Sequence, residues 1–473
     1  MESAWLSLVP FIIVIAISIW LKEILPGLVL GLLTGSIIAK GNILEGLQQV
    51  INYLVKTLSD ETNIKIIGFL YLFGGLVGMM KIAGGIKGFS EWVGTKVKSN
   101  RGLLGLIWLT LPFTFMMPMF RIMMIGPVVK SLMEKSNLSK QKVGFTMDVS
   151  TASTIVLLPA GTAFTGFMIS LVEAGIQRHQ IDFSPYQVFL LSIPFNFFAI
   201  AMLLVGLLNT FWLSPKKKRP VHQKNNEKMD QHPYHGIGIK QELAMVKAQP
   251  WNLIVPLFLL LGLSLFLLWQ DGIANGGKSV FQAFSKADAT FVMLLSVFIT
   301  LVITFIFYVI RHVPLKEILY HFYDGGNQLM QAIILLILVW SLSLAAEDLG
   351  FSDFISSTLG TFLPSYLVPA IIFVIGSAVG YFIGSSWGTW GLFMPLGMTL
   401  AISSGASIPL TVGAVFAAGS FGAMTSPLGD TTITTASILE MPLVEYARYK
   451  LKFTAIGGAA AIVLYVSFGF FSG

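Results

Sequence analysis

The residues that could do chemistry gather most densely in one short stretch, Thr425-Ser426-Pro427-Leu428-Gly429-Asp430-Thr431-Thr432. Proline and glycine interrupt a helix, and the interruption frees backbone carbonyls beside the hydroxyls of Ser426, Thr431 and Thr432. With the carboxylate of Asp430, these oxygens form the shell that a small hard cation prefers. We therefore predict an ion-coupling site in this stretch, with Asp430 as a ligand for sodium. An alternative is that Asp430 only caps a half-helix that begins near Thr431.

A second carboxylate lies in an otherwise apolar stretch of the first half. Asp148 is followed by Ser150, Thr151, Ser153 and Thr154. An ionisable residue inside a membrane span is costly, and it usually faces a partner or a cavity. We predict that Asp148 and Thr151 take part in ion coupling and that Asp148 is a second sodium ligand. The hydroxyls could also simply bond carbonyls of their own helix.

A third group carries small and aromatic side chains, in the run from Gly384 to Gly391. Its candidate substrate-binding residues are Ser385, Ser386, Trp387 and Thr389. Here the glycines allow two backbones to approach closely, and the hydroxyls would face whatever lies between them. The alternative is that the small residues only pack helices together.

Arg121 is a permanent positive charge at the predicted depth of the membrane. Its planar guanidinium matches a carboxylate with two parallel hydrogen bonds, so it could bind the carboxylate of an organic substrate. The alternative is that Arg121 pairs internally with Asp148.

The elements that must position these residues are membrane helices. The chain has 473 residues, of which 55% are hydrophobic and only 11% charged, so water cannot solvate most of its surface. There is no cysteine, which excludes disulfides and thiolate metal sites. We predict an all-α polytopic membrane protein with the following crossings: 5–22, 25–40, 64–82, a broken span 142–176, 186–212, 251–270, 290–310, 329–347, a broken span 409–440, and 452–471.

The two halves of the chain match each other at a constant distance. Pro127 precedes Pro159-Ala160-Gly161 by the same spacing with which Pro395 precedes Pro427-Leu428-Gly429. We predict two inverted repeats of about five crossings, each with a re-entrant hairpin, at 102–134 and 364–403. The repeats occupy 1–213 and 251–473, and a basic cytoplasmic linker at 214–250 joins them.

The distribution of charge predicts the orientation. With both termini outside, six of the 30 basic residues are extracellular and 23 are cytoplasmic, while Arg121 lies in the membrane. We therefore expect a multi-pass protein of the cell membrane. Its partners are membrane lipid, a small cation and, in one alternative, a small carboxylate-bearing solute; a homodimer is also open. Nucleic-acid binding is not expected, since the basic cluster follows a span.

One enzyme class shares part of the pattern. Leu428-Gly429-Asp430, with Tyr323-Asp324 upstream, is similar to the paired aspartates of intramembrane aspartyl proteases. However, Pro427 stands where those enzymes have glycine, and Asp324 falls in a predicted cytoplasmic segment. We therefore keep the protease only as a remote alternative and expect no enzyme activity and no cofactor.

The motifs resemble those of the NhaC-type sodium/proton antiporters, in the wider superfamily of ion transporters built from inverted repeats. The resemblance rests on Gly384-Ser385-Ser386-Trp387-Gly388-Thr389 and on Ser426-Pro427-Leu428-Gly429-Asp430-Thr431-Thr432. In the first half it rests on Ile125-Gly126-Pro127-Val128 and on Asp148 with Ser150-Thr151. It implies cation-coupled secondary transport, with sodium or protons as coupling ions. Ahead of Ile125 this chain has Met117-Pro118-Met119-Phe120-Arg121 where the family commonly places an acidic pair, which leaves a sodium- or proton-coupled amino acid or carboxylate transporter as the alternative.

Overall fold

The computed structural model describes residues 4–82, 99–134, 136, 138–179, 183–212, 249–358 and 363–472. Within these ranges the regular structure is helical and contains no strand, as the apolar composition predicts. The predicted linker at 214–250 lies outside the described residues except for its last two positions.

The helices of the first half follow one another with short connections. Their bounds are α1 Val9–Leu21, after a 3₁₀ turn at Ala4–Leu8, α2 Ile24–Lys40, α3 Ile43–Leu58, α4 Glu61–Ile82, α6 Asn100–Leu109, α7 Pro118–Glu134, α8 Lys140–Ile155, α9 Ala163–His179, α10 Pro185–Ser192 and α11 Phe197–Phe211.

The second half repeats this order with longer helices. Their bounds are α13 Trp251–Ala274, α14 Val280–Lys286, α15 Ala289–Ile310, α16 Leu315–Gln328, α17 Met330–Asp348, α18 Phe351–Ser357, α20 Val368–Ile383, α21 Ser386–Ser404, α22 Ile408–Thr425, α23 Asp430–Ile438 and α24 Leu443–Ser472.

Helix starts recur at the predicted distance. Helices α7 and α21 begin 268 residues apart, at Pro118 and Ser386, and α8 and α22 also begin 268 residues apart, at Lys140 and Ile408. In each half a helical pair is therefore followed by a helix that breaks and restarts. The opposite orientation of the two repeats stays a prediction.

Seven helices in the described ranges are long and apolar enough to cross a membrane, and the bent pair α10–α11 brings the number to eight. One of them differs from the sequence prediction, because Ser365–Ile383 passes this test although it was assigned to an arm of a re-entrant hairpin. The reason is that α20 runs without interruption to Ile383, and the chain turns only at Gly384, whose φ is +75°. The first two helices, Trp5–Leu21 and Ile24–Lys40, are apolar but shorter.

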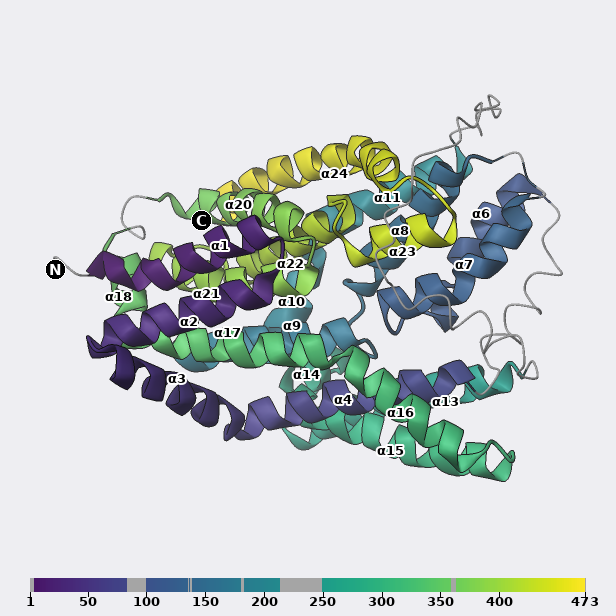
Figure 1. Cartoon of the computed structure of the whole chain (residues 1–473), viewed down its shortest axis with the longest axis horizontal. Helices are drawn as coiled ribbons and strands as arrows, with labels where there is room; N and C mark the ends of the chain where they lie inside the picture. The colour runs from purple at the N-terminus through teal and green to yellow at the C-terminus, as the bar shows by residue number, and fades with distance from the viewer. Residues whose placement is uncertain are drawn as a thin grey trace.

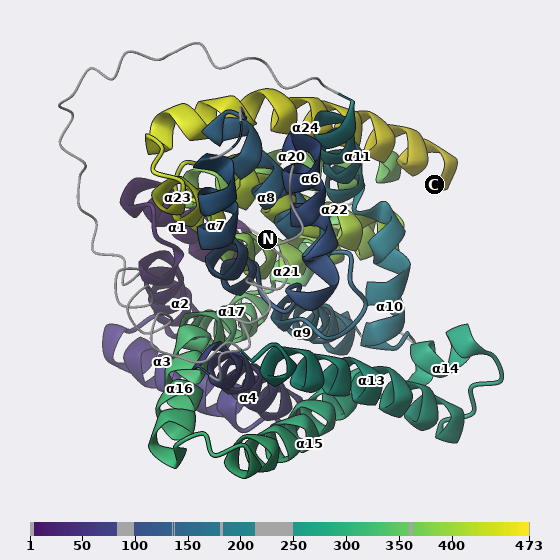
Figure 2. The same ribbon diagram turned by 90° about the vertical axis from the view of Figure 1, so that its right-hand side faces the viewer.

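The helices form two groups (Figure 1). Helices α4, α13, α15 and α16 pack together, and Figure 2 shows them on the opposite side of the molecule from α11, α22 and α24. Glycines make the first group tight: a Cβ at Gly78 would lie 2.0 Å from the carbonyl oxygen of His321.

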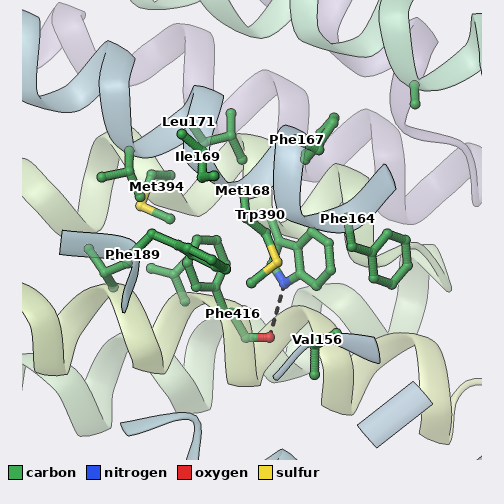
Figure 3. Close-up of a cluster of buried hydrophobic side chains, with 14 of the residues drawn as sticks. Val156, Phe164, Phe167, Met168, Ile169, Leu171, Phe189, Trp390, Met394 and Phe416 are labelled. Carbon is green, nitrogen blue, oxygen red and sulfur yellow. Dashed lines mark hydrogen bonds between the residues drawn. The ribbon is translucent and has the colours of Figure 1, made fainter. Parts of the chain in front are cut away.

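An aromatic core holds the second group to α9 (Figure 3). Trp390 of α21 is fully buried, and its indole N–H donates a 2.9 Å hydrogen bond to the carbonyl of Phe416 on α22. Phe164 of α9 meets the Trp390 ring edge-on at 5.0 Å between centroids. This core fixes α21 and α22, which carry the second-half motifs, against the first half.

Candidate ion-coupling site

The two second-half motifs meet in the structure. Gly384 forms the turn between α20 and α21 with a left-handed φ of +75°, and a Cβ there would lie 2.7 Å from the Cβ of Leu428. Only glycine fits this turn and this contact. The tip of the α20–α21 hairpin therefore lies against the break between α22 and α23.

The break itself is four residues long. Helix α22 ends at Thr425, and α23 begins at Asp430 with Gly429 as its N-cap in an extended conformation. Pro427 offers no N–H, and the amide of Leu428 donates to the hydroxyl of Ser426 at 3.0 Å. The alternative that Asp430 caps a helix beginning near Thr431 is wrong, because the helix starts one residue earlier and the cap position makes no side-chain hydrogen bond.

The Asp430 carboxylate is exposed at the edge of the break. It stands in the first turn of α23, where a negative charge is favourable. The carboxylate of Glu23, in the α1–α2 turn, lies near enough to repel it. The two acidic side chains give this edge of the molecule a negative potential that attracts cations.

Asp148 is fully buried and paired. The ammonium of Lys450, on α24, donates to its Oδ2 at 2.7 Å. Tyr446 donates to the same oxygen at 2.8 Å, and Thr435 donates to Oδ1 at 2.5 Å. Lys450 also donates to the Thr432 hydroxyl at 2.6 Å. The pair thus connects α8 of the first half with α23 and α24 of the second.

Lys450, Tyr446 and Thr435 are functional candidates that sequence reasoning missed. The last span was predicted to begin at 452, which left Lys450 in the cytoplasm, but α24 begins at Leu443. A signal was present, since Tyr446 and Lys450 are four residues apart and share one helix face.

Arg121 is fully buried and does not pair with Asp148, which corrects that alternative. All of its hydrogen bonds go to uncharged oxygens. Its Nε donates to Thr151, Nη1 to Thr110 and Thr114, and Nη2 to the Ile107 carbonyl and Ser150, at 2.6 to 3.2 Å. These bonds use the five N–H groups of the guanidinium. In this conformation no N–H remains for a substrate carboxylate.

The predicted substrate-binding residues of α21 make local contacts. Ser385 caps the helix by accepting from Gly388, and Thr389 donates to the Ser385 carbonyl at 2.8 Å. Ser386 donates to the Gly419 carbonyl on α22 at 3.2 Å. Trp387 is half-buried, and its ring meets Phe164 and Phe167 edge-on, each at 4.6 Å.

Carboxylates do not cluster around these residues. The described residues contain no group of three or more His, Cys, Asp or Glu side chains that could hold a metal ion. A cation bound here would therefore depend on hydroxyl and carbonyl oxygens as much as on Asp148 or Asp430. Asp324, the second aspartate of the protease alternative, accepts a hydrogen bond from Gln328 within α16.

Comparison with known proteins assigns the class. The model of the Na⁺/H⁺ antiporter family matches residues 155–470. An uncharacterised protein of Haemophilus influenzae is 24% identical over 99% of this chain and 91% of its own. An arginine/ornithine antiporter of Halobacterium salinarum is 34% identical over 29% of this chain and 28% of its own.

The fold is similar to that of a solved transporter, the YdaH protein of Alcanivorax borkumensis. The two share 12% sequence identity, with a TM-score of 0.57 over 90% of this chain and 89% of the other. The match confirms the all-α transporter architecture. The chain is thus a multi-pass, cation-coupled secondary transporter rather than an enzyme, and it belongs to the Na⁺/H⁺ antiporter family.

Proposed function

We propose that the protein exchanges sodium for protons and that Asp148 is the carboxylate on which the exchange turns. The observation that carries this proposal is the buried ion pair between Asp148 and Lys450, whose side chains are both fully enclosed. Removing two charges from water is costly, so a buried pair is weak evidence for a purely stabilising role. The Lys450 ammonium occupies the position beside Asp148 that a sodium ion would take.

Exchange follows from competition for this position. When sodium binds Asp148, Lys450 loses its carboxylate partner and keeps only the hydroxyl of Thr432. An ammonium without a counter-charge in a low-dielectric interior is disfavoured, so the lysine gives up its proton. When a proton returns to Lys450, the ion pair re-forms and sodium leaves. Tyr446 and Thr435 hold the carboxylate in place in both steps.

A substitution at Lys450 tests this scheme. Lys450→Arg keeps the positive charge but cannot release a proton, so sodium-driven proton movement in liposomes should fall to the level of empty vesicles. Lys452→Arg, on the exposed face of the same helix, is the matched control and should exchange like the parent. Asp148→Asn should also abolish exchange. Parent-rate exchange in Lys450→Arg would show that this ammonium does not carry the proton.

We further propose that Asp430, with Ser426 and Thr431, lies on the path by which cations reach Asp148. The support is its exposed carboxylate near Glu23 and its position at the break. Asp430→Asn should raise the sodium concentration needed for half-maximal exchange rather than abolish exchange, since the buried pair is intact.

A second candidate function is the cation-coupled transport of an amino acid or organic carboxylate. It is favoured by the archaeal relative, whose name is arginine/ornithine antiporter. In that case Ser385, Ser386, Trp387 and Thr389 would contact the solute, and Arg121 would have to leave its hydroxyl partners to bind a carboxylate. Liposomes that take up labelled amino acids in a sodium gradient would support this function, and sodium–proton exchange without any organic solute would support the first.

We propose the inverted arrangement of the two repeats, both termini outside and the 214–250 linker in the cytoplasm of a cell-membrane protein. The excess of basic residues on the linker side supports it. Labelling of single cysteines introduced at exposed Trp5 and Arg311 in intact cells tests the orientation, because only the first should react with an impermeant reagent.

A further inference from the structure

We propose that the last turn of α22 is a second, uncharged cation site, formed by the Thr425 hydroxyl and by backbone carbonyls at the end of that helix. The inference rests on the proposed function only in taking the transported ion to be a small monovalent cation. It adds a position that is separate from Asp148 and Lys450.

The first observation concerns backbone carbonyls that lose their helical donors. The last bond of α22 runs from the Ser426 amide to the Gly422 carbonyl. The carbonyls of Ala423, Met424 and Thr425 would next accept from residues 427, 428 and 429. Residue 427 is proline and has no N–H, the Leu428 amide donates to the Ser426 hydroxyl, and the Gly429 amide donates to the Ser426 carbonyl.

The second observation is the side chain of Thr425 itself. It is 1% exposed, and its hydroxyl has no hydrogen-bond partner among the described residues. Other hydroxyls of α22 bond the carbonyl four residues earlier, as Ser420 does with Phe416 at 2.8 Å. A buried hydroxyl without a partner costs free energy unless something else uses its oxygen.

The surroundings exclude water from this turn. A Cβ at Gly429 would lie 2.1 Å from the Ala423 carbonyl oxygen, so the chain folds back directly over the helix end. A Cβ at Gly422 would lie 2.4 Å from the Gly380 carbonyl carbon, so α20 closes the other side. Oxygens that water cannot reach keep their full attraction for a dehydrated ion.

The oxygens select the kind of ion. All are neutral, and they stand at the negative end of the α22 dipole. Divalent cations prefer several carboxylates, and no such cluster exists among the described residues. Sodium and lithium suit such a shell of hydroxyl and carbonyl oxygens. Because none of these ligands titrates, binding should be nearly independent of pH, in contrast to binding at Asp148.

Sodium binding to the purified full-length protein tests the site. Labelled sodium is titrated at constant ionic strength with choline chloride, and lithium and potassium serve as competitors. Thr425→Val removes only the hydroxyl, and it should weaken binding about tenfold. Thr425→Ser should restore it. Thr304→Val is the matched control, because that hydroxyl is also buried without a partner but lies on α15.

A second variant tests the carbonyls without touching Thr425. Pro427→Ala supplies an N–H that can donate to the Ala423 carbonyl, so it should weaken sodium binding and extend α22. Thermal unfolding of each variant shows that it is folded. Unchanged sodium affinity in both Thr425→Val and Pro427→Ala would overturn the site.

The outcome for the site is distinct from the outcome for the proposed function. The double variant Asp148→Asn/Lys450→Met removes the exchange pair without leaving a buried charge. It should lose sodium–proton exchange in liposomes and still bind sodium in a Thr425-dependent manner. Loss of all sodium binding in the double variant would overturn the second site and leave the exchange mechanism standing. A parent that binds sodium through Thr425 but exchanges no protons would do the opposite.

Discussion

The two broken helices of this transporter have the same spacing but opposite hydrogen-bond status. In the first break, between Ile155 and Ala163, the chain satisfies its own carbonyls. The amides of Leu157 and Leu158 donate to Thr154 and Ile155. The freed carbonyls of Leu158 and Pro159 accept from the hydroxyls of Thr165 at 3.1 Å and Tyr186 at 3.0 Å.

The second break leaves its carbonyls without such donors. The amides that follow α22 are absent at Pro427 or turn to Ser426, and the Thr425 hydroxyl stays without a partner. The repeat thus preserves the proline that opens the helix but not the side chains that close the opening. A break that satisfies itself can serve as structure, whereas a break that does not has oxygens left for a ligand.

The hairpins differ in the same sense. Arg121 on α7 and Thr389 on α21 are 268 residues apart, as the helix starts are. Arg121 fills the first-half position with a side chain that bonds α6 and α8. In the second half, glycines bring α20 and α22 into backbone contact, and Thr389 bonds only its own helix. The first half is therefore fastened by hydrogen bonds, and the second by close packing.

The largest expected effect comes from the charge pair that joins the two halves. Lys450→Met leaves the Asp148 carboxylate buried without a counter-charge, which should lower the free energy of unfolding by about 3–5 kcal/mol. Asp148→Asn/Lys450→Met should recover most of this loss, because no charge is left unpaired. Denaturant titration in detergent measures both variants. A double variant as unstable as Lys450→Met would mean that packing at Lys450, not charge, holds the halves together.

The next effect concerns the fastening of the first hairpin. Arg121→Lys keeps the charge but has three donors in place of five, so some of its five acceptors lose their partner. We expect a loss of about 2–3 kcal/mol in the free energy of unfolding. Arg311→Lys, at an exposed position, should change it by less than about 0.5 kcal/mol.

Transport by the same variant decides between the roles of Arg121. Sodium–proton exchange in Arg121→Lys should persist in vesicles that contain folded protein, since the guanidinium touches only uncharged oxygens. A selective loss of organic-solute uptake, with exchange and stability intact, would instead identify the guanidinium as a carboxylate anchor.

The sequence predicts the framework of this comparison better than its chemistry. Prolines and glycines at a fixed spacing locate both breaks to within a few residues, because these residues act through their own backbone. The partners of Asp148 and Arg121 come from helices far away in sequence. Lys450 lies beside Arg448 and Lys452, and only the packing of α24 against α8 shows which of the three is buried. Likewise, hydroxyls were visible along α8, but their use by Arg121 depends on how α7 is placed.

A smaller effect is expected where a side chain closes the first break. Tyr186→Phe removes the hydroxyl that donates to the Pro159 carbonyl, and it should lower the free energy of unfolding by about 1 kcal/mol. Sodium affinity should not change, because this break takes no part in binding. Tyr308→Phe, which removes a hydroxyl bonded to the Asn252 carbonyl on α13, is the control for the chemical change. A drop in sodium affinity for Tyr186→Phe alone would give the first break a role in binding.

The smallest effect is expected at the proline of the first break, and it tests the comparison most directly. Pro159→Ala restores an N–H at the position that matches Pro427. Its helical acceptor would be the Ile155 carbonyl, which already accepts from Leu158 at 3.4 Å. The new donor therefore changes little, and we expect less than about 0.5 kcal/mol in stability and no change in sodium binding. Pro427→Ala offers the same N–H to a carbonyl without a donor and should weaken sodium binding. Titrations of the two variants side by side measure the difference. Equal losses of affinity would mean that both breaks hold the ion, and the contrast between a closed and an open break would fail.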